Sequence, residues 1–230
     1  MPAPTSTPEP AARIPLARER VIETAVAVAD RVGVEKLTIR ALADALDVKP
    51  MSLYHHVAGK EAILDGIVDR VFAEIDAPPL EMDWPAAMRH RCLAMRTVLA
   101  RHAWATPLME TRTSPGEAAL AHHESVLACL RRGGLSLQLT AHAYAVLDAF
   151  VYGFALEEAN LPLQGGDEIA DRAEQMLAGM DETRYPSLVE LTREHVLQPD
   201  YDYGSSFEVG LDLLLEGLAS RAAAESQRSP

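Results

Sequence analysis

Residues 38–60, TIRALADALDVKPMSLYHHVAGK, constrain the fold more than any other part of the chain. Apolar residues recur every three or four positions in two short segments joined by a tight turn, which is the pattern of a helix-turn-helix. Thr38 is placed to cap the first helix, and Pro50 suits the first turn of the second helix, where its missing N–H has no intrahelical partner. Asp47, in the turn, tolerates a left-handed backbone conformation. Units of this kind commonly bind the major groove of DNA.

The second helical segment has a buried side and an exposed side. Leu53 and Val57 lie four residues apart and form the buried stripe of a short helix. The other side chains face outward and are candidates for contacts with base edges: Met51, Ser52, His55 and His56. Two amphipathic helices of an ordinary helical bundle would show a similar pattern, and this is the alternative interpretation. A phosphate-binding P-loop is excluded because Tyr54 stands where glycine is required, five residues before Gly59.

This stretch resembles the TetR family of transcriptional repressors, whose members commonly show a Thr-x-Arg-x-x-Ala-x-x-x-Gly-Val-x-x-x-x-Leu-Tyr-x-His-Phe-x-x-Lys run. The chain departs from that run at Asp47, where glycine is usual, and at Val57, where phenylalanine is common. The resemblance implies a DNA-binding domain over residues 16–60, with a first helix over 18–33, and a connecting helix over 61–76. The matching residues are Thr38, Arg40, Ala43, Val48, Leu53, Tyr54, His56 and Lys60.

The same resemblance implies roles on DNA. Arg40 would donate hydrogen bonds to guanine or to phosphate, and Tyr54 and Lys60 would bind phosphate oxygens. Pro50 replaces a hydrogen-bonding glutamine of the tetracycline repressor, so we do not expect recognition of that repressor's operator. The predicted DNA-binding residues are Arg40, Lys49, Pro50, Met51, Ser52, Tyr54, His55, His56 and Lys60.

Length and composition indicate a globular protein with a sizeable core. The chain has 230 residues, of which 48% are hydrophobic and 24% are charged. Residues 1–15 hold five of the fifteen prolines and are expected to form a disordered arm, and residues 225–230 a disordered tail. We find no apolar stretch near 18 residues and no signal sequence, and therefore expect a cytoplasmic protein without membrane contact. Cys92 and Cys129 fit reduced structural thiols.

The net charge of −13 is distributed unevenly. Residues 13–60 contain eight Lys or Arg and six Asp or Glu, a balance of +2, whereas the rest of the chain carries −15. A small basic DNA-binding unit on an acidic body is favourable when one face meets phosphate, because repulsion elsewhere discourages nonspecific contact.

Residues 77–224 have a helical pattern and no convincing alternating strand. We therefore expect an all-α fold: an N-terminal three-helix DNA-binding domain followed by a helical bundle for ligand binding and dimerisation. Ser114–Glu117 and Ser205–Glu208 have the form of capping boxes, which would start two of these helices. The expected helices cover about 84–103, 106–112, 116–132, 136–159, 167–180, 185–196 and 205–224.

Two of these helices are too apolar for the surface of a monomer: 136–159 carries two apolar stripes and 205–224 carries one apolar seam. In TetR-like proteins two such helices pair with the same two of another subunit, so the resemblance implies a homodimer. A dimer would place two reading helices about 34–36 Å apart, as a palindromic operator requires. The alternative is that both apolar stripes are intramolecular core. The predicted dimerisation residues are Val146, Phe150, Phe154, Phe207, Leu211, Leu214 and Leu218.

The helix over 84–103 has a methionine-rich face that favours either a ligand pocket or plain core. The resemblance to the tetracycline-repressor subgroup over residues 84–162 favours a pocket for a small-molecule effector, whose binding would move the connecting helix and release DNA. The predicted ligand-binding residues are Met88, Arg91, Cys92, Met95, Leu99, His102, Trp104, Met109 and Phe150.

The effector is not expected to be a tetracycline–magnesium complex. Met109 falls at the position of that repressor's metal-binding histidine, and a thioether is a poor ligand for Mg²⁺. Arg91 falls at a drug-contacting asparagine, which indicates either an anionic group on the ligand or a solvated arginine. His122 and His123 are adjacent and therefore splayed apart on a helix, so no metal site is predicted.

Two other functions stay open. One is a ligand-independent DNA-binding dimer, which a fully packed body would favour and a void lined by Met95, Trp104 and Met109 would not. The other is a helical-bundle enzyme. We find no nucleophile elbow, dinucleotide fingerprint or zinc-protease motif, and we predict neither catalysis nor a cofactor.

Overall fold

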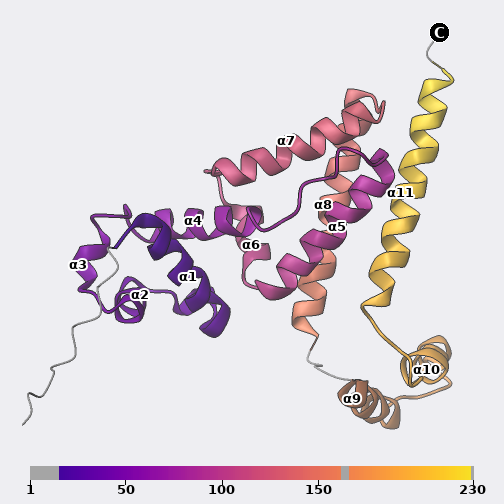
Figure 1. Cartoon of the computed structure of the whole chain (residues 1–230). Coiled ribbons are helices and arrows are strands. Elements are labelled where there is room, and N and C mark those ends of the chain that lie inside the picture. Colours follow the sequence, from indigo (N-terminus) through magenta and orange to yellow (C-terminus); the bar gives the residue numbers. More distant parts are fainter. Residues whose placement is uncertain (1–15, 162–165, 229–230) are drawn as a thin grey trace, which may run out of the picture.

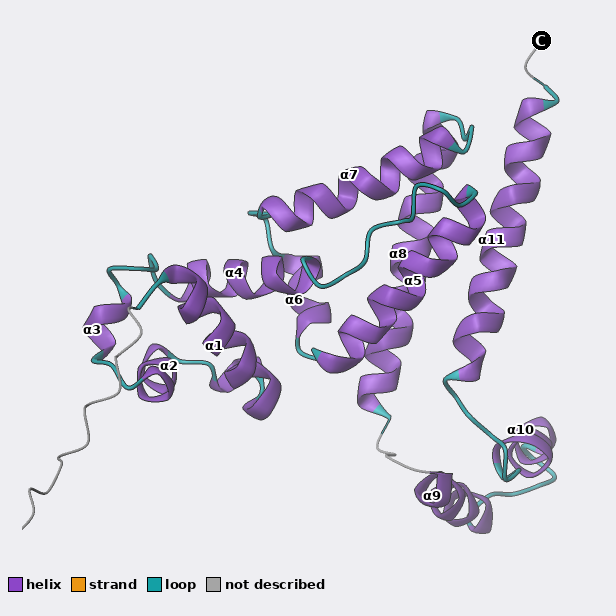
Figure 2. Ribbon diagram, in the orientation of Figure 1, coloured by secondary structure: helices purple, strands orange, loops and turns teal. Residues whose placement is uncertain are grey.

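The structure, a computed structural model, describes residues 16–161 and 166–228 (Figure 1). The described residues contain helices and no strand, which confirms the predicted all-α class (Figure 2). Short irregular helical turns at Val34–Lys36 and Thr192–Val196 supplement the α-helices. The α-helices are α1 Arg18–Val32, α2 Ile39–Leu46, α3 Pro50–Leu53, α4 Lys60–Phe72, α5 Trp84–Arg101, α6 Ala105–Thr111, α7 Glu117–Arg132, α8 Leu137–Asn160, α9 Gly166–Ala178, α10 Pro186–Leu191 and α11 Ser205–Ser226.

The predicted helix-turn-helix forms at α2 and α3. The Thr38 hydroxyl accepts a hydrogen bond from the backbone N–H of Ala41 at 3.1 Å, which caps α2. Asp47 ends α2 with φ 53° and ψ 48°, the left-handed conformation expected of it. Pro50 occupies the first turn of α3. Local sequence signals therefore determine this motif.

Two apolar cores share α4. The first core joins α1, α2 and α3 to the N-terminal half of α4, where Ile63 and Ile67 are 2% and 0% exposed. The second core begins one residue later, at Val68, and includes Phe72 together with α5, α7, α8 and α11. A rigid helix therefore connects the DNA-binding unit with the body, as Figure 1 shows at the left of the molecule.

The body is built around α8, which packs against α5, α7 and α11. By length and composition α8 could cross a membrane, contrary to the expectation that no such stretch exists. Its apolar character is explained by its central place in the bundle, since Leu147 and Val151 are 1% and 0% exposed. Figure 1 shows α9 and α10 beyond the C-terminal end of α8, away from the DNA-binding unit.

Both predicted capping boxes are wrong. The N-cap of α7 is Gly116, which has no side chain to cap with, and α11 begins after Gly204 without a side-chain cap. Instead, Asp69 of α4 accepts a hydrogen bond from the N–H of Ala119 at 2.9 Å. A side chain from another helix thus replaces the local cap of α7.

The expected terminal segments are only partly described. The arm at 1–15 lies outside the described residues, as do the last two residues of the chain. Helix α11 continues to Ser226, two residues into the segment expected to be a tail.

Candidate DNA-binding surface and ligand cavity

The segment over residues 50–57, which consists of α3 and the turn after it, has the two sides that its sequence predicts. Leu53 is fully buried and Val57 is 4% exposed, so both belong to the N-terminal core. Met51 and Tyr54 are 71% and 50% exposed. These two large side chains are therefore accessible for contacts with DNA. Pro50 and His55 are also exposed, and Ser52 and His56 are half-buried.

Basic side chains surround this surface. Arg40, Lys49 and Lys60 are exposed, and none has an ion pair among the described residues. Lys60 is also the first residue of α4, whose N-terminus carries a partial positive charge. The turn before it needs glycine, because Gly59 has φ 128°. The arrangement is suited to phosphate oxygens.

A cavity of about 420 Å³ lies in the body, lined by α4, α6, α7, α8 and the segment between α6 and α7. Its apolar lining includes Phe72 from α4 and Met109 from α6. Its polar lining includes three residues of α8, Tyr144, Asp148 and Tyr152, which follow one another at intervals of four residues. That interval places the three side chains in one column along the helix.

Each member of this column has a different polar environment. The Tyr144 hydroxyl lies 2.7 Å from Nδ1 of His123, on α7. Tyr152 is 8% exposed and has no hydrogen bond among the described residues, and its hydroxyl oxygen remains accessible. Burial is the main cause that raises the pKa of both phenols, so both are protonated and can donate.

Asp148, between the two tyrosines, is held by a buried guanidinium. Arg91 is fully buried, and its NH1 atom lies 2.6 Å from Oδ1 of Asp148. Arg91 also donates from Nε to Nε2 of His122 at 3.1 Å. Burial and the Arg91 charge lower the pKa of His122 to about 3, so its imidazole is neutral.

These contacts correct both interpretations offered for Arg91. It is neither solvated nor directed at an anionic ligand, because its charge is compensated by Asp148. Folding brings α5, α7 and α8 together at this point, and sequence spacing within one helix could not show the pairing.

Most of the other predicted ligand residues do not line the cavity. Met109 does, whereas Met88, Cys92, Met95 and Leu99 are between 0% and 1% exposed and belong to the body's core. Phe150 stacks on Phe207 with ring centroids 5.1 Å apart. The cavity instead uses α8 residues that the prediction omitted. A sequence signal existed, since Asp148 lies in the middle of an apolar helix whose other carboxylates, Glu157 and Glu158, are at its C-terminal end.

His102 and Trp104 lie at the junction between the DNA-binding unit and the body. Nδ1 of His102 lies 2.7 Å from Oδ1 of Asp30, on α1, and Nε2 lies 3.2 Å from Oε2 of Glu74, just after α4. Trp104 donates from its indole N–H to the same oxygen of Asp30 at 2.6 Å. Arg101 pairs with Glu74 at 3.3 Å. The two predicted ligand residues therefore join the two parts of the protein.

Further contacts tie α4 to the walls of the cavity. Arg112 donates from Nε to Asp65 at 2.6 Å and from NH2 to Glu61 at 2.9 Å. The Phe72 ring lies 5.5 Å from that of His122 and 5.2 Å from that of His123, between centroids. A change in the cavity would reach α4 through these groups.

The predicted dimerisation residues divide into two groups. Phe207, Leu211 and Leu218 are 7% exposed or less and pack within the chain, as the alternative interpretation of core stripes expected. Phe154 belongs with them, because its ring contacts both Phe207 and Tyr203. Leu214 and Phe150 are half-buried.

An apolar surface nevertheless remains on α8 and α11. Val146 is 42% exposed on α8, and Val209 and Leu213 are 62% and 67% exposed on α11. The exposed stripe on α11 is therefore offset by two residues from the predicted one, because Phe207 and Leu211 turn inward. A groove lined by Val146, Leu213 and Gly217, among others, runs along the surface between the two helices.

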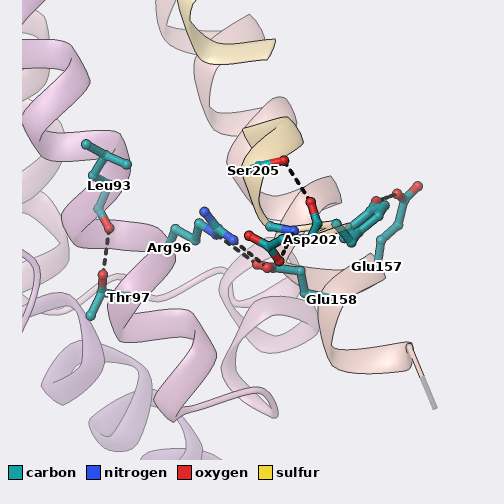
Figure 3. Close-up of polar contacts among 9 residues, drawn as sticks. Leu93, Arg96, Thr97, Glu157, Glu158, Asp202 and Ser205 are labelled. Atoms are coloured by element: carbon teal, nitrogen blue, oxygen red, sulfur yellow. Dashed lines mark hydrogen bonds and ion pairs between the residues drawn. The ribbon is translucent and has the colours of Figure 1, made fainter. Parts of the chain in front are cut away.

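Near the start of α11, one arginine organises the contacts between helices. Arg96 of α5 donates from Nε to Glu158 of α8 at 2.9 Å, a pairing that Figure 3 shows in the centre of the view. Its guanidinium carbon also lies 4.7 Å from the centroid of the Phe207 ring. Glu158 therefore joins the end of α8 to α5, and its neighbour Glu157 accepts a hydrogen bond from the Tyr203 hydroxyl.

The chain matches two family models that together cover most of its length. Residues 21–67 match "Bacterial regulatory proteins, tetR family", and residues 77–222 match "Tetracyclin repressor-like, C-terminal domain". A curated relative from Saccharopolyspora erythraea, an HTH-type transcriptional regulator, is 32% identical over 91% of this chain and 87% of its own length. The HTH-type transcriptional repressor DrrR1 of Streptomyces coeruleorubidus is 33% identical over 88% of this chain and 77% of its own.

Solved structures agree with these matches. Apo ActR from Streptomyces coelicolor superposes with a TM-score of 0.77 and 28% identity, covering 93% of this chain and all of its own. The same protein in complex with actinorhodin superposes with a TM-score of 0.75 and 30% identity, over 91% of this chain and 99% of its own.

Proposed function

This chain belongs to the TetR family of bacterial transcriptional regulators, and from that membership we propose that it is a repressor which a small molecule releases from DNA. The observation that carries the proposal is α4, which belongs to the apolar core of the DNA-binding unit and to the wall of the cavity. A ligand that displaces Phe72 would move the helix that positions α3.

The proposed DNA-binding residues are those predicted from the sequence. Met51, Ser52, His55 and His56 would meet base edges, with Arg40 at guanine or phosphate. Tyr54 and Lys60 would bind phosphate oxygens and position α3 in the major groove. The exposure of Met51 and Tyr54 supports this assignment.

We propose that the protein acts as a cytoplasmic homodimer on a palindromic operator. The exposed apolar side chains of α8 and α11 support the dimer, because a large apolar patch on a soluble protein marks an interface. Two copies related by a twofold axis would present two α3 helices to successive major grooves.

The regulating ligand would occupy the 420 Å³ cavity. Its volume falls within the range of sites for small organic molecules. ActR, a relative of the same fold, has been crystallised with actinorhodin and with (S)-DNPA. To act as a switch, the ligand must favour the released conformation by roughly 1–3 kcal/mol or more.

The cavity also bears on the ligand-independent alternative, which a fully packed body would have favoured. Met109 lines the observed cavity, as predicted. Met95 and Trp104 do not line it, and residues of α8 do. A polar column in such a space is expected for ligand recognition and is costly as plain core.

The deciding experiment measures binding of the purified protein to DNA from the region upstream of its own gene, with salt and random-sequence DNA as competitors. We expect retained binding to one palindromic site in the presence of excess random DNA. Binding that random DNA abolishes completely at every upstream fragment would refute the regulator as proposed.

A further inference from the structure

The lining of the cavity carries an excess of negative charge. Its charged lining consists of three carboxylates, Asp65, Glu110 and Asp148, and one guanidinium, Arg112. The formal charge of the lining is therefore −2. Adding the two ion-pair partners just outside it, Arg91 and Glu61, leaves that balance unchanged. His123, the lining imidazole, does not offset it, because burial lowers its pKa.

Neither arginine is available to an anionic ligand. Arg91 forms an ion pair with Asp148 and a hydrogen bond to His122, and its side chain is 1% exposed. Arg112 binds Asp65 and Glu61 at the same time. A carboxylate entering the cavity would meet carboxylates without a free cation, and like charges at such distances repel.

Asp148 and Tyr152 form an open acceptor and donor pair. The Asp148 side chain keeps 11% exposure, more than that of its partner Arg91, and it lines the cavity. The Tyr152 hydroxyl is accessible in a residue that is 92% buried, and it has no partner among the described residues. An accessible hydroxyl without a partner among the described residues is free to donate to a hydrogen-bond acceptor on a molecule that enters the cavity.

From this geometry we propose that the cavity selects planar aromatic ligands that carry an ammonium group, which binds Asp148, and an acceptor such as a carbonyl, which binds Tyr152. Phe72, Tyr144 and Met109 supply surfaces against which a ring system packs. The ammonium compensates the charge of the lining, and carboxylated analogues are rejected. This inference rests on the proposed ligand-released repressor and specifies the chemistry of its effector.

The test uses two probes with one ring system and opposite charge, 2-(aminomethyl)anthraquinone and anthraquinone-2-carboxylate. Calorimetric titration of the full chain at pH 7.5, without DNA, gives a dissociation constant for each probe. We expect the amine to bind at least about tenfold more tightly than the carboxylate. Asp148→Asn should remove that preference.

Tyr152→Phe provides a variant whose folding is not in question, because the hydroxyl that it removes has no partner among the described residues. It should weaken binding of the amine about threefold to tenfold and leave the unfolding temperature within about 1 °C of the unmodified chain. If Asp148→Asn does not fold, Glu110→Gln, at an exposed residue of the same lining, should reduce the preference instead.

Three results would overturn the proposal: neither probe binds, the carboxylate binds as tightly as the amine, or Tyr152→Phe binds the amine as well as the unmodified chain does. The DNA-binding experiment is independent of these titrations. A chain that holds its operator but prefers the carboxylate would refute the ligand chemistry alone. A chain that prefers the amine but binds no specific DNA would refute the repressor.

Discussion

Arg91 of α5 donates a hydrogen bond from Nε to Nε2 of His122 on α7, across 3.1 Å in the interior of the body. The accepting nitrogen carries no proton, so the imidazole is neutral and its other nitrogen holds the hydrogen. The same guanidinium pairs with Asp148 of α8. One buried cation therefore joins three helices beside the cavity, and the His122 ring continues the contact to Phe72 of α4.

This contact predicts a dependence of stability on pH. The pKa of His122 is about 3 in the folded chain, below its value of roughly 6.5 when unfolded, chiefly because of burial. Between those values the unfolded state binds a proton that the folded state does not. The free energy of unfolding should therefore rise with pH through this window, by at most about 1.4 kcal/mol per pH unit from this group, and level off above pH 6.5.

His122→Gln, which keeps an acceptor for Arg91, should flatten the slope between pH 4.5 and 6.5. The slope is measured by urea unfolding at several pH values. His55→Gln, at an exposed residue of the turn after α3, is the control and should leave the slope as it is. An unchanged slope in His122→Gln would show that this imidazole is protonated in the folded chain.

Removing the buried cation should destabilise the protein strongly. Arg91→Met leaves the Asp148 carboxylate buried without its partner, which costs about 3–5 kcal/mol. The double variant Arg91→Met with Asp148→Leu should recover most of that loss, because apolar side chains can fill the same space. Chemical denaturation measures both.

Arg89→Met is the matched control, two residues away on the same helix. Arg89 pairs with Glu208 and Asp212 at the surface, where ion pairs contribute about 0–1 kcal/mol. A loss in Arg91→Met no larger than that in Arg89→Met would contradict the buried ion pair.

Two substitutions on the DNA-binding surface should behave differently. Lys60→Ala removes a phosphate contact, so it should weaken binding to all DNA and lower the salt slope by about 1. Ser52→Ala should instead relax the preference at one base position. Fluorescence anisotropy with specific and random duplexes distinguishes the two, and equal losses on both duplexes in both variants would refute the assignment.

The exposed face of α11 predicts the oligomeric state. Leu213→Glu introduces a charge at a side chain that is 67% exposed in the single chain, and it should convert a dimer to monomers in sedimentation velocity. Leu80→Glu changes a residue that is 74% exposed in the segment between α4 and α5, and should stay dimeric. A dimer that survives Leu213→Glu would place the interface elsewhere.

The sequence alone determined the helix-turn-helix and the all-α class, because both depend on short-range effects. The Thr38 hydroxyl caps α2 at Ala41, three residues later. Asp47 tolerates the left-handed conformation that ends α2, and Pro50 favours the first turn of α3, in which it lies. The period of the apolar residues likewise predicts the helices of the body, because it is read within each segment and does not depend on which helices pack against it.

The cavity and its polar groups were decided by tertiary structure. Met95 and Leu99 have the spacing of a pocket wall but turn into the core, since periodicity shows which face of a helix is buried and not what covers it. The cap of α7 comes from Asp69, fifty residues earlier in the chain. Arg91 finds Asp148 and His122 only when α5, α7 and α8 pack together, and the energy of such a buried charge depends on that three-dimensional neighbourhood.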